Sequence, residues 1–322
     1  MSTAQIEQLM APIALYPDAL LAQVLMAATY PMEVVHASRW LGREGRATLE
    51  GEALVAALRD EPWDASVKSL VAVPVVLLHM NTNLEWTQQV GDAFLAQPRD
   101  VFRAIQALRR RARLNGTLAS GSEQTVAETD EAIVVEPTDP TVGYVPIYDP
   151  DWAYGGWPYP DYPPIYLPPP PGLGAALIAG IIIASRVPIA TPHWGWARPA
   201  WRDGDIRIDA DRVRRIDRTP SAATGDRWQH DVRHRQGVAY RTPELRDRFQ
   251  GGRDPQRAAR EQYRGHADGQ RAAGRDGPRA LEGIGDGADA RAASRRGAYS
   301  RPTPAPRAGG FGRGGGGRGG RR

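Results

Sequence analysis

Four stretches in the first hundred residues begin with a proline and continue with apolar residues at helical spacing. The clearest covers residues 17–31 and reads PDALLAQVLMAATYP, in which large apolar residues recur every three or four positions. Similar starts follow at Pro31, Pro62 and Pro98. Because proline fits the first turn of a helix but breaks its interior, this pattern predicts a succession of short helices.

The predicted helices cover most of the first 116 residues. Asp18 and Asp64 take the N-cap position of two of them, where a carboxylate accepts a hydrogen bond from a free backbone N–H. Gly42 and Asn115 are placed to end two others. We therefore predict an all-helical domain over residues 1–116, long enough to bury one core. Its helices are expected near residues 18–28, 31–41, 49–58, 64–71, 74–80, 84–96 and 100–115.

The pattern changes after the last of these helices. Residues 124–128, 132–136 and 142–148 are rich in β-branched residues and are separated by turn-forming residues. Pro146 favours an edge position for the third strand, because proline cannot donate a hydrogen bond to a neighbouring strand. We predict that residues 117–150 form a small β-hairpin or sheet packed on the helical domain, so the fold class is mainly α.

Proline and tyrosine dominate the next segment, residues 151–171. Eight of the fourteen residues from 158 to 171 are proline, and three are tyrosine. Such a sequence favours extended polyproline II structure with exposed rings. Two interpretations are open: a stiff spacer, or a docking site for a protein partner with an aromatic-lined groove.

A long uncharged apolar run, GLGAALIAGIIIAS, covers residues 172–185. As a helix it would reach about 21 Å, short of the roughly 30 Å hydrocarbon core of a bilayer. Small residues recur at every fourth position in it: Gly172, Ala176, Gly180 and Ala184. On a helix this spacing forms a stripe of the kind that lets membrane helices pack closely. We predict a short glycine-zipper-like helix that supports self-association or membrane contact, with a helix or strand buried inside a soluble domain as the alternative.

The following segment, residues 186–250, is basic and largely without regular pattern. Ile206 and Ile208 alternate with charged residues, which predicts a single strand. His230 and His234 are four residues apart, a spacing that on one helix face suits a metal-binding pair. Two arginines adjoin the pair and no third ligand is evident, so it is only a weak metal candidate and no cofactor is predicted.

The charge is distributed unevenly along the chain. Residues 1–150 contain 11 basic and 19 acidic residues, whereas residues 151–322 contain 30 basic and 18 acidic residues. The tail, residues 251–322, is rich in arginine, glycine and alanine and cannot bury enough apolar surface to fold, so we predict that it is disordered. Tails of this composition bind nucleic acids or other anionic surfaces, including anionic lipid.

The sequence contains no recognisable catalytic constellation. A set of carboxylates could work in pairs and one histidine lies in the helical region, but nothing in the sequence brings two of these residues together: Asp18, Glu33, Asp64, Glu85, Asp149 and His79. Nucleophile-elbow, phosphate-loop and dinucleotide-binding motifs are absent. The lack of cysteine excludes disulfides, thiol catalysis and cysteine-based zinc sites. We therefore predict a protein that is not an enzyme and has no catalytic residues.

Five stretches within residues 4–250 carry a resemblance to the bacterial family catalogued as domain of unknown function 3300. In order, they are QIEQLMAPIALYPDALLAQVLMAATYP, WDASVKSLVAVP, GDAFLAQPRDVFRAIQALRRRA, YVPIYDP and WQHDVRHRQGVAY. The resemblance implies an uncharacterised protein associated with the cell envelope or membrane, and the family has no assigned catalytic residues. Family members are exported, but only MSTA precedes the first stretch here. We therefore expect either a signal peptide upstream of this start or a cytoplasmic variant.

Together these features predict a non-enzymatic envelope or membrane-associated protein that acts as a structural or interaction module. Its expected partners are a membrane or other anionic surface, a protein that docks on the proline–tyrosine segment, and a second copy through the apolar run. A cytoplasmic protein that binds nucleic acid through residues 251–322 is the alternative.

Overall fold

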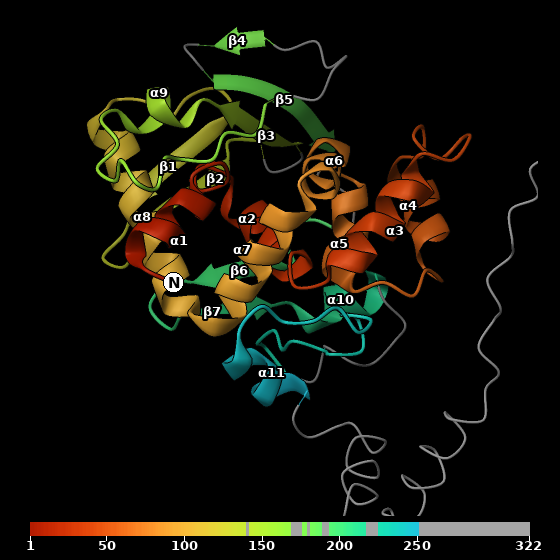
Figure 1. The fold of residues 1–322 in the computed structure, drawn as a ribbon. Helices are drawn as coiled ribbons and strands as arrows, with labels where there is room; N and C mark the ends of the chain where they lie inside the picture. Colours follow the sequence, from red (N-terminus) through yellow and green to blue (C-terminus); the bar gives the residue numbers. More distant parts are fainter. Residues whose placement is uncertain (140–141, 169–175, 179–180, 189–192, 217–224, 251–322) are drawn as a thin grey trace, which may run out of the picture. The chain divides into compact units, whose positions relative to one another are not determined.

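A computed structural model describes residues 1–139, 142–168, 176–178, 181–188, 193–216 and 225–250 (Figure 1). Residues 1–258 belong to one compact unit. Helices form its N-terminal part, as the sequence predicts. They are α1 (Thr3–Met10), α2 (Asp18–Ala27), α3 (Pro31–Leu41), α4 (Gly51–Leu58), α5 (Ala65–Val71), α6 (Pro74–Thr82), α7 (Leu84–Ala96) and α8 (Pro98–Leu114).

Helix α2 lies in the core of this unit. Nine of its ten residues are buried, as expected for a helix that is apolar on all sides. It contacts α5, α7, β2 and β6. The approach of α7 is close, because a Cβ atom added to Gly91 would lie 2.2 Å from the carbonyl oxygen of Ala28. A residue with a side chain at position 91 therefore cannot be accommodated without separating the two helices.

The two predicted aspartate caps differ in outcome. Pro17 is the N-cap of α2 and no side chain caps that helix, so the predicted cap role of Asp18 is wrong. The Asp18 carboxylate turns instead to the buried guanidinium of Arg109, 2.6 Å away, because a buried cation needs a paired anion. The prediction for Asp64 is confirmed, since its carboxylate accepts a hydrogen bond of 2.8 Å from the backbone N–H of Ser66 at the start of α5.

Short antiparallel pairings complete the front of the chain. The strands are β1 (Gln124–Glu128), β2 (Ile133–Pro137), β3 (Val142–Tyr148), β4 (Ala176–Ile178) and β5 (Ile181–Pro188). β1 and β2 form a hairpin, whereas β3 pairs with β5 in a sheet of order β3-β5-β4. β3 is thus an edge strand, and its register shifts at Pro146, as the proline predicts.

The helix predicted over residues 172–185 is wrong wherever the structure describes this segment, because β4 and β5 are strands. The isoleucine run favours extended structure, and β3 supplies the partner edge that a sequence search for helical spacing does not reveal. Of the predicted stripe of small residues, Ala176 lies in β4 and Ala184 in β5. Gly172 and Gly180 lie outside the described residues.

The proline–tyrosine segment packs on the helical domain. It begins with α9 (Pro150–Tyr154) and continues without helix or strand as far as Pro168. Gln8 of α1 donates a hydrogen bond of 2.7 Å from Nε2 to the carbonyl of Pro163. Arg111 of α8 lies over two aromatic rings of the segment. Where the structure describes it, this segment therefore lies against α1 and α8.

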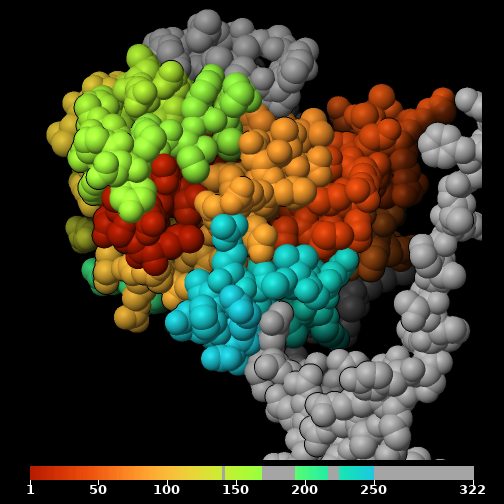
Figure 2. Space-filling model, in the orientation of Figure 1, coloured from red at the N-terminus to blue at the C-terminus, as the bar shows by residue number. Residues whose placement is uncertain are grey.

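The basic segment, predicted to be irregular, contains regular elements that complete the same unit. They are β6 (Ala197–Ala200), β7 (Asp205–Ile208), α10 (Ala210–Ile216) and α11 (Pro243–Gln250). β7 contains the strand predicted around Ile206 and Ile208, and it pairs with β6 rather than standing alone. The hairpin lies against α2. Residues 225–250, cyan in Figure 2, lie directly against the helical region, drawn in orange.

The fold is mainly α with small antiparallel pairings, as predicted. In the described part of the chain no single helix has both the length and the apolar composition of a membrane span, and only the pair α5–α6, bent by 112°, meets that criterion jointly. The predicted disordered tail, residues 251–322, lies outside the described residues.

Candidate functional site

The two histidines singled out in the sequence lie in residues 225–250, a segment that we call the clasp because it folds over α3 and α7. Its central attachment is Arg235, whose side chain is buried. Nη2 lies 2.7 Å from Oδ1 of Asp92 in α7, and Nη1 donates to the carbonyl of Thr29 at 3.2 Å. The guanidinium carbon also lies 3.9 Å from the ring centroid of Tyr240. A guanidinium that is both paired and stacked can be buried at a tolerable energetic cost.

His234 attaches the clasp to α3. Its Nδ1 lies 2.7 Å from Oε1 of Glu33, and Oε2 of the same carboxylate accepts a hydrogen bond of 2.7 Å from the backbone N–H of Asp64. Burial acts to lower the pKa of His234, but the hydrogen bond and charge of Glu33 raise it above its usual value. Burial also raises the pKa of Glu33, against the effect of His234. The pair is therefore a charge-assisted hydrogen bond when the imidazole is protonated.

His230 has the opposite character. Its ring stacks on Tyr30, with centroids 5.2 Å apart and planes 14° apart, and its Nε2 lies 2.8 Å from the hydroxyl of Tyr240. Its Nδ1 is buried and has no hydrogen-bond partner among the described residues. Burial, reinforced by the charge of Arg235, lowers the pKa of His230 to about 3. At neutral pH this imidazole is uncharged.

The structure does not bring the two histidines together as metal ligands. Residues 232–237 form turns and not the helix that the spacing requires. The backbone of Gln236 and Gly237 has positive φ, at 53° and 79°, which is incompatible with a helix. Within the described residues, no group of three His, Cys, Asp or Glu side chains is placed to hold a metal ion.

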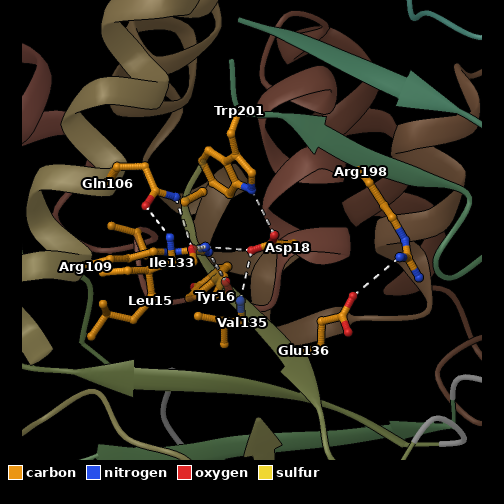
Figure 3. Close-up of polar contacts among 12 residues, drawn as sticks. Leu15, Tyr16, Asp18, Gln106, Arg109, Ile133, Val135, Glu136, Arg198 and Trp201 are labelled. Atoms are coloured by element: carbon orange, nitrogen blue, oxygen red, sulfur yellow. Dashed lines mark hydrogen bonds and ion pairs between the residues drawn. The ribbon is translucent and has the colours of Figure 1, made fainter. Parts of the chain in front are cut away.

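A second buried polar centre surrounds Asp18 and Arg109 (Figure 3). The Arg109 side chain of α8 is fully buried, with Nη1 2.6 Å from Oδ1 of Asp18. Its N–H groups also donate to the carbonyls of Ala14, Tyr16 and Ile133 at 2.7 to 2.9 Å. This guanidinium therefore has the paired and hydrogen-bonded environment that a buried charge requires.

Asp18 extends the same centre to the distal part of the chain. Its carboxylate accepts hydrogen bonds from the backbone N–H of Val135 in β2 at 3.3 Å and from the indole N–H of Trp201 at 3.2 Å (Figure 3). The guanidinium of Arg109 lies 4.9 Å from the centroid of the Trp201 ring. The Asp18 carboxylate of α2 thus contacts α8, β2 and the connection between β6 and β7.

The remaining candidate catalytic residues also have structural contacts. Glu85 pairs with Arg241 of the clasp at 3.5 Å. Asp149 accepts a hydrogen bond from the backbone N–H of Asp151 and caps α9. Burial lowers the pKa of His79, whose Nε2 lies 2.7 Å from the carbonyl oxygen of Pro168. Glu85 contacts the clasp, whereas Asp149 and His79 contact the two ends of the described proline–tyrosine segment.

His193 is buried in the core beside α2. Its carbonyl accepts a hydrogen bond of 2.7 Å from Nε2 of Gln23. Neither ring nitrogen has a hydrogen-bond partner among the described residues. Burial, together with the positive charge of Lys68, lowers the pKa of His193 to about 4.

Charges of the two halves meet across the fold. Within the part of the chain that the structure describes, five ion pairs join a basic residue beyond 190 to an acidic residue before 140: Arg198–Glu136, Arg202–Glu131, His234–Glu33, Arg235–Asp92 and Arg241–Glu85. The arginines of residues 193–250 are therefore partly neutralised by the acidic front of the chain. The numbers of basic and acidic residues in the two halves of the sequence do not reveal this pairing.

Sequence reasoning missed Asp92, Arg109, His193 and Arg235 as key polar residues. A signal was present at Asp92, which interrupts the apolar face of α7 where a buried charge requires a partner. Arg109 is hidden in a run of arginines, and its burial follows only from the phase of α8 against the core.

Comparison with known proteins shows which family the chain matches. The family model described as "Protein of unknown function (DUF3300)" matches residues 2–231. The chain is similar to the uncharacterized protein YacH of Escherichia coli, with 35% identity over 312 residues. This match covers 77% of the chain but 50% of YacH, so the chain spans about half the length of this curated relative. No solved structure matches the chain.

Proposed function

The chain belongs to the DUF3300 family of proteins of unknown function, and from its own structure we propose that it is a non-enzymatic structural or interaction module of the bacterial cell envelope. In this proposal the folded unit is a scaffold, and the basic tail holds that scaffold at an anionic surface. The observation that carries the proposal is that residues 1–250 have a net negative charge and residues 251–322 a net positive charge.

The charge of the folded unit and that of the tail have opposite signs. Residues 1–250 contain 25 basic and 30 acidic residues, whereas residues 251–322 contain 16 basic and 7 acidic residues. The ion pairs between the two parts of the chain occupy several arginines of the basic segment, and the excess of basic residues in the sequence lies in the tail. A cationic tail on an acidic body favours attachment of the tail while the body stays away from the same surface.

The role of the buried carboxylates supports the non-enzymatic part of the proposal. Asp18 and Asp92 each bind a guanidinium from a distant part of the chain, whereas Asp64 caps α5, and these contacts account for the burial of the three carboxylates. A general acid or base must instead face a substrate. We therefore infer that these three carboxylates stabilise the folded unit.

The proline–tyrosine segment supports a role in protein interaction. It lies on α1 with its backbone partly hydrogen-bonded, while the rings of Tyr162 and Tyr166 are exposed. A partner with an aromatic-lined groove would meet a segment that is already ordered, which lowers the entropic cost of binding. Self-association through residues 176–188 is a further proposal, now through strands instead of a helix.

Co-sedimentation with lipid vesicles tests the attachment. The full chain should bind vesicles that contain phosphatidylglycerol, should bind pure phosphatidylcholine weakly, and should be released as salt is raised, because the attraction is screened. A chain that ends at Gln250 is the matched control, since it keeps the whole described unit and should not bind. Equal binding by the two chains would contradict the role of the tail.

Nucleic acid is the competing ligand for the same tail. If the full chain binds single-stranded RNA more tightly than anionic vesicles at equal salt, and if the chain ending at Gln250 does not, the alternative of a cytoplasmic nucleic-acid-binding protein is favoured. Fractionation of the native host with an antibody then decides the compartment. Recovery in the envelope fraction supports the proposal, and recovery in the cytoplasm contradicts it.

A further inference from the structure

The clasp is attached to the helices by a small number of polar contacts around one aromatic cluster. Arg235 binds Asp92, His234 binds Glu33, and the backbone N–H of Asp231 donates to the hydroxyl of Tyr30 at 3.1 Å. Gln88 of α7 adds a hydrogen bond of 2.9 Å to the carbonyl of Ala239. The clasp also contributes Trp228 to the apolar core, and the backbone N–H of Trp228 donates to the carbonyl of Ile206 in β7 at 2.9 Å. Its polar contacts with the helices are concentrated around Tyr30.

Tyr30 stands between the two histidines. The ring of His230 is stacked on it, and the ring of His234 lies 5.6 Å away, tilted by 58°. His230 is further enclosed by Trp228 and Phe249 from the clasp itself, at 6.1 and 4.9 Å between centroids. A proton on His230 would therefore be placed in an aromatic environment without a carboxylate in hydrogen-bond contact.

The charged and titratable groups around His230 come from both sides of the interface. From the clasp they are Asp231, His234, Arg235, Tyr240 and Arg248, and from the helices they are Tyr30, Glu33, Asp64 and Asp92. The acidic groups already have partners: Asp231 binds Arg233, Glu33 binds His234, and Asp92 binds Arg235. The two nearby arginines repel a second cation at this position.

The two histidines respond to pH in opposite directions. His234 is stabilised in its protonated form by Glu33, so its contribution is present below its undocked pKa and is lost as the pH rises through its raised pKa. His230 is neutral when docked, whereas a free imidazole takes up a proton near pH 6.5. Its burial therefore disfavours docking as the pH falls below that value. The pKa of His230 lies further from its ordinary value than that of His234, so the acid effect dominates.

We propose that residues 225–250 are a proton-sensitive clasp, which leaves the helical domain in mildly acidic surroundings when His230 takes up a proton. Release uncovers the rings of Tyr30 and Phe94, which pack against His230 and Trp228 in the docked state. It also frees the segment from which the tail continues. The inference concerns the clasp alone and does not depend on the proposed attachment to an anionic surface.

Hydrogen exchange of the full chain, followed by mass spectrometry, tests this proposal. Exchange is measured at about pH 7.5 and about pH 5.0 and corrected for the intrinsic rate, and a peptide covering 228–240 is compared with one from α8. His230 alone should raise the opening constant of the clasp by about 30-fold at the lower pH, and the contributions of His234 and Glu33 act in the opposite direction and make the observed rise smaller. The α8 peptide should stay far more protected than the clasp peptide at the lower pH if only the clasp opens, although its exchange through global unfolding also rises there.

Variants of His230 separate titration from packing. His230→Phe keeps an aromatic ring against Tyr30, and His230→Gln keeps a group that can hydrogen-bond to Tyr240; neither takes up a proton. Both should abolish the acid-dependent opening, whichever of the two docks better. His36→Gln, at a half-buried position of α3 outside the clasp, should keep the wild-type ratio. The proposal is overturned if the His230 variants keep the wild-type ratio, or if the α8 peptide opens together with the clasp.

Discussion

Arg109 shows how one side chain can determine the arrangement of several elements. It is fully buried, and it binds Asp18 together with the backbone carbonyls of three residues, Ala14, Tyr16 and Ile133. Bringing a guanidinium into the core costs free energy, but removing it leaves the buried Asp18 carboxylate without its positively charged partner. Its value lies in specifying one packing of α2, α8 and β2.

Arg109→Met should therefore lower the free energy of unfolding by about 3–5 kcal/mol, because it leaves the buried Asp18 carboxylate without a cation. Urea denaturation followed by circular dichroism measures the change. Arg103→Met is the control on the same helix. Arg103 pairs with Asp100, but the two side chains are 76% and 42% exposed, so its loss should cost less than about 1 kcal/mol. Similar costs for the two variants would show that the buried pair does not hold the fold.

His193 predicts a pH dependence of global stability. Its pKa is about 4 in the folded chain, because burial and Lys68 disfavour the charged form. Below about pH 6.5 the unfolded chain takes up a proton that the folded chain does not, so stability falls as the pH falls towards 4. Between neutral pH and about pH 4.5 this one group should cost about 2–3 kcal/mol.

His193→Leu should remove that part of the acid sensitivity. Urea denaturation of both chains at neutral pH and at about pH 4.5 gives four free energies of unfolding, and the wild type should lose about 2–3 kcal/mol more than the variant. An equal loss in both chains would mean that His193 is protonated in the fold or that it titrates in the same way in both states.

Among the elements, α2 and α7 are in contact at a glycine. Gly91→Ala should destabilise the fold although alanine is the better helix former by about 1 kcal/mol. The added Cβ would stand 2.2 Å from the carbonyl oxygen of Ala28, so the backbones must separate, at a net cost of about 1–3 kcal/mol or more. Thermal unfolding of Gly91→Ala and of Gly121→Ala makes the comparison. A Cβ at Gly121 meets nothing within 4 Å, so an equally large effect there would contradict the packing argument.

The elements also show where prediction from the sequence succeeds and where it fails. The helices α2 to α8 follow from apolar spacing and, in part, from proline starts, because these are local signals, whereas α1 was not predicted. Asp18 fits the local pattern of a cap, but a buried cation far along the chain captures its carboxylate. The helix prediction for the segment that contains β5 fails for a related reason. Pairing with β3 favours the extended conformation of β5, and no local sequence pattern reveals that pairing. Competition between a local preference and a distant partner is invisible without the fold.

The candidate site was less predictable than the fold. The sequence pointed to His230 and His234 as a possible pair on a helix, but the chain that joins them forms a turn and not a helix. One histidine belongs with Tyr30 and Tyr240, and the other with Glu33, a residue some two hundred positions away. The chemistry of each imidazole is set by these distant partners and not by the spacing between the two.

At the scale of the whole molecule, residues 193–250 complete the core of the helical domain. Their buried side chains include Trp194, Trp196 and Trp228, and Trp196 donates a hydrogen bond of 2.9 Å to Ser69 of α5. Each buried aromatic side chain stabilises a fold by about 2–3 kcal/mol. Since a domain has only about 5–15 kcal/mol of net stability, the helical part should not be stable without them.

Two chain ends test this dependence. A chain that ends at Gln250 keeps every described contact and should unfold cooperatively at the same urea midpoint as the full chain. A chain that ends at residue 190 loses Trp196, Trp201 and Arg235 together, which removes the Arg235 guanidinium from Asp92 and one hydrogen bond from Asp18. We expect this shorter chain to retain helix but to lose the cooperative transition, because specific packing would no longer fix one arrangement. If it unfolded at the full-chain midpoint, residues 1–190 would be a domain of their own, and the basic segment would be an addition to it.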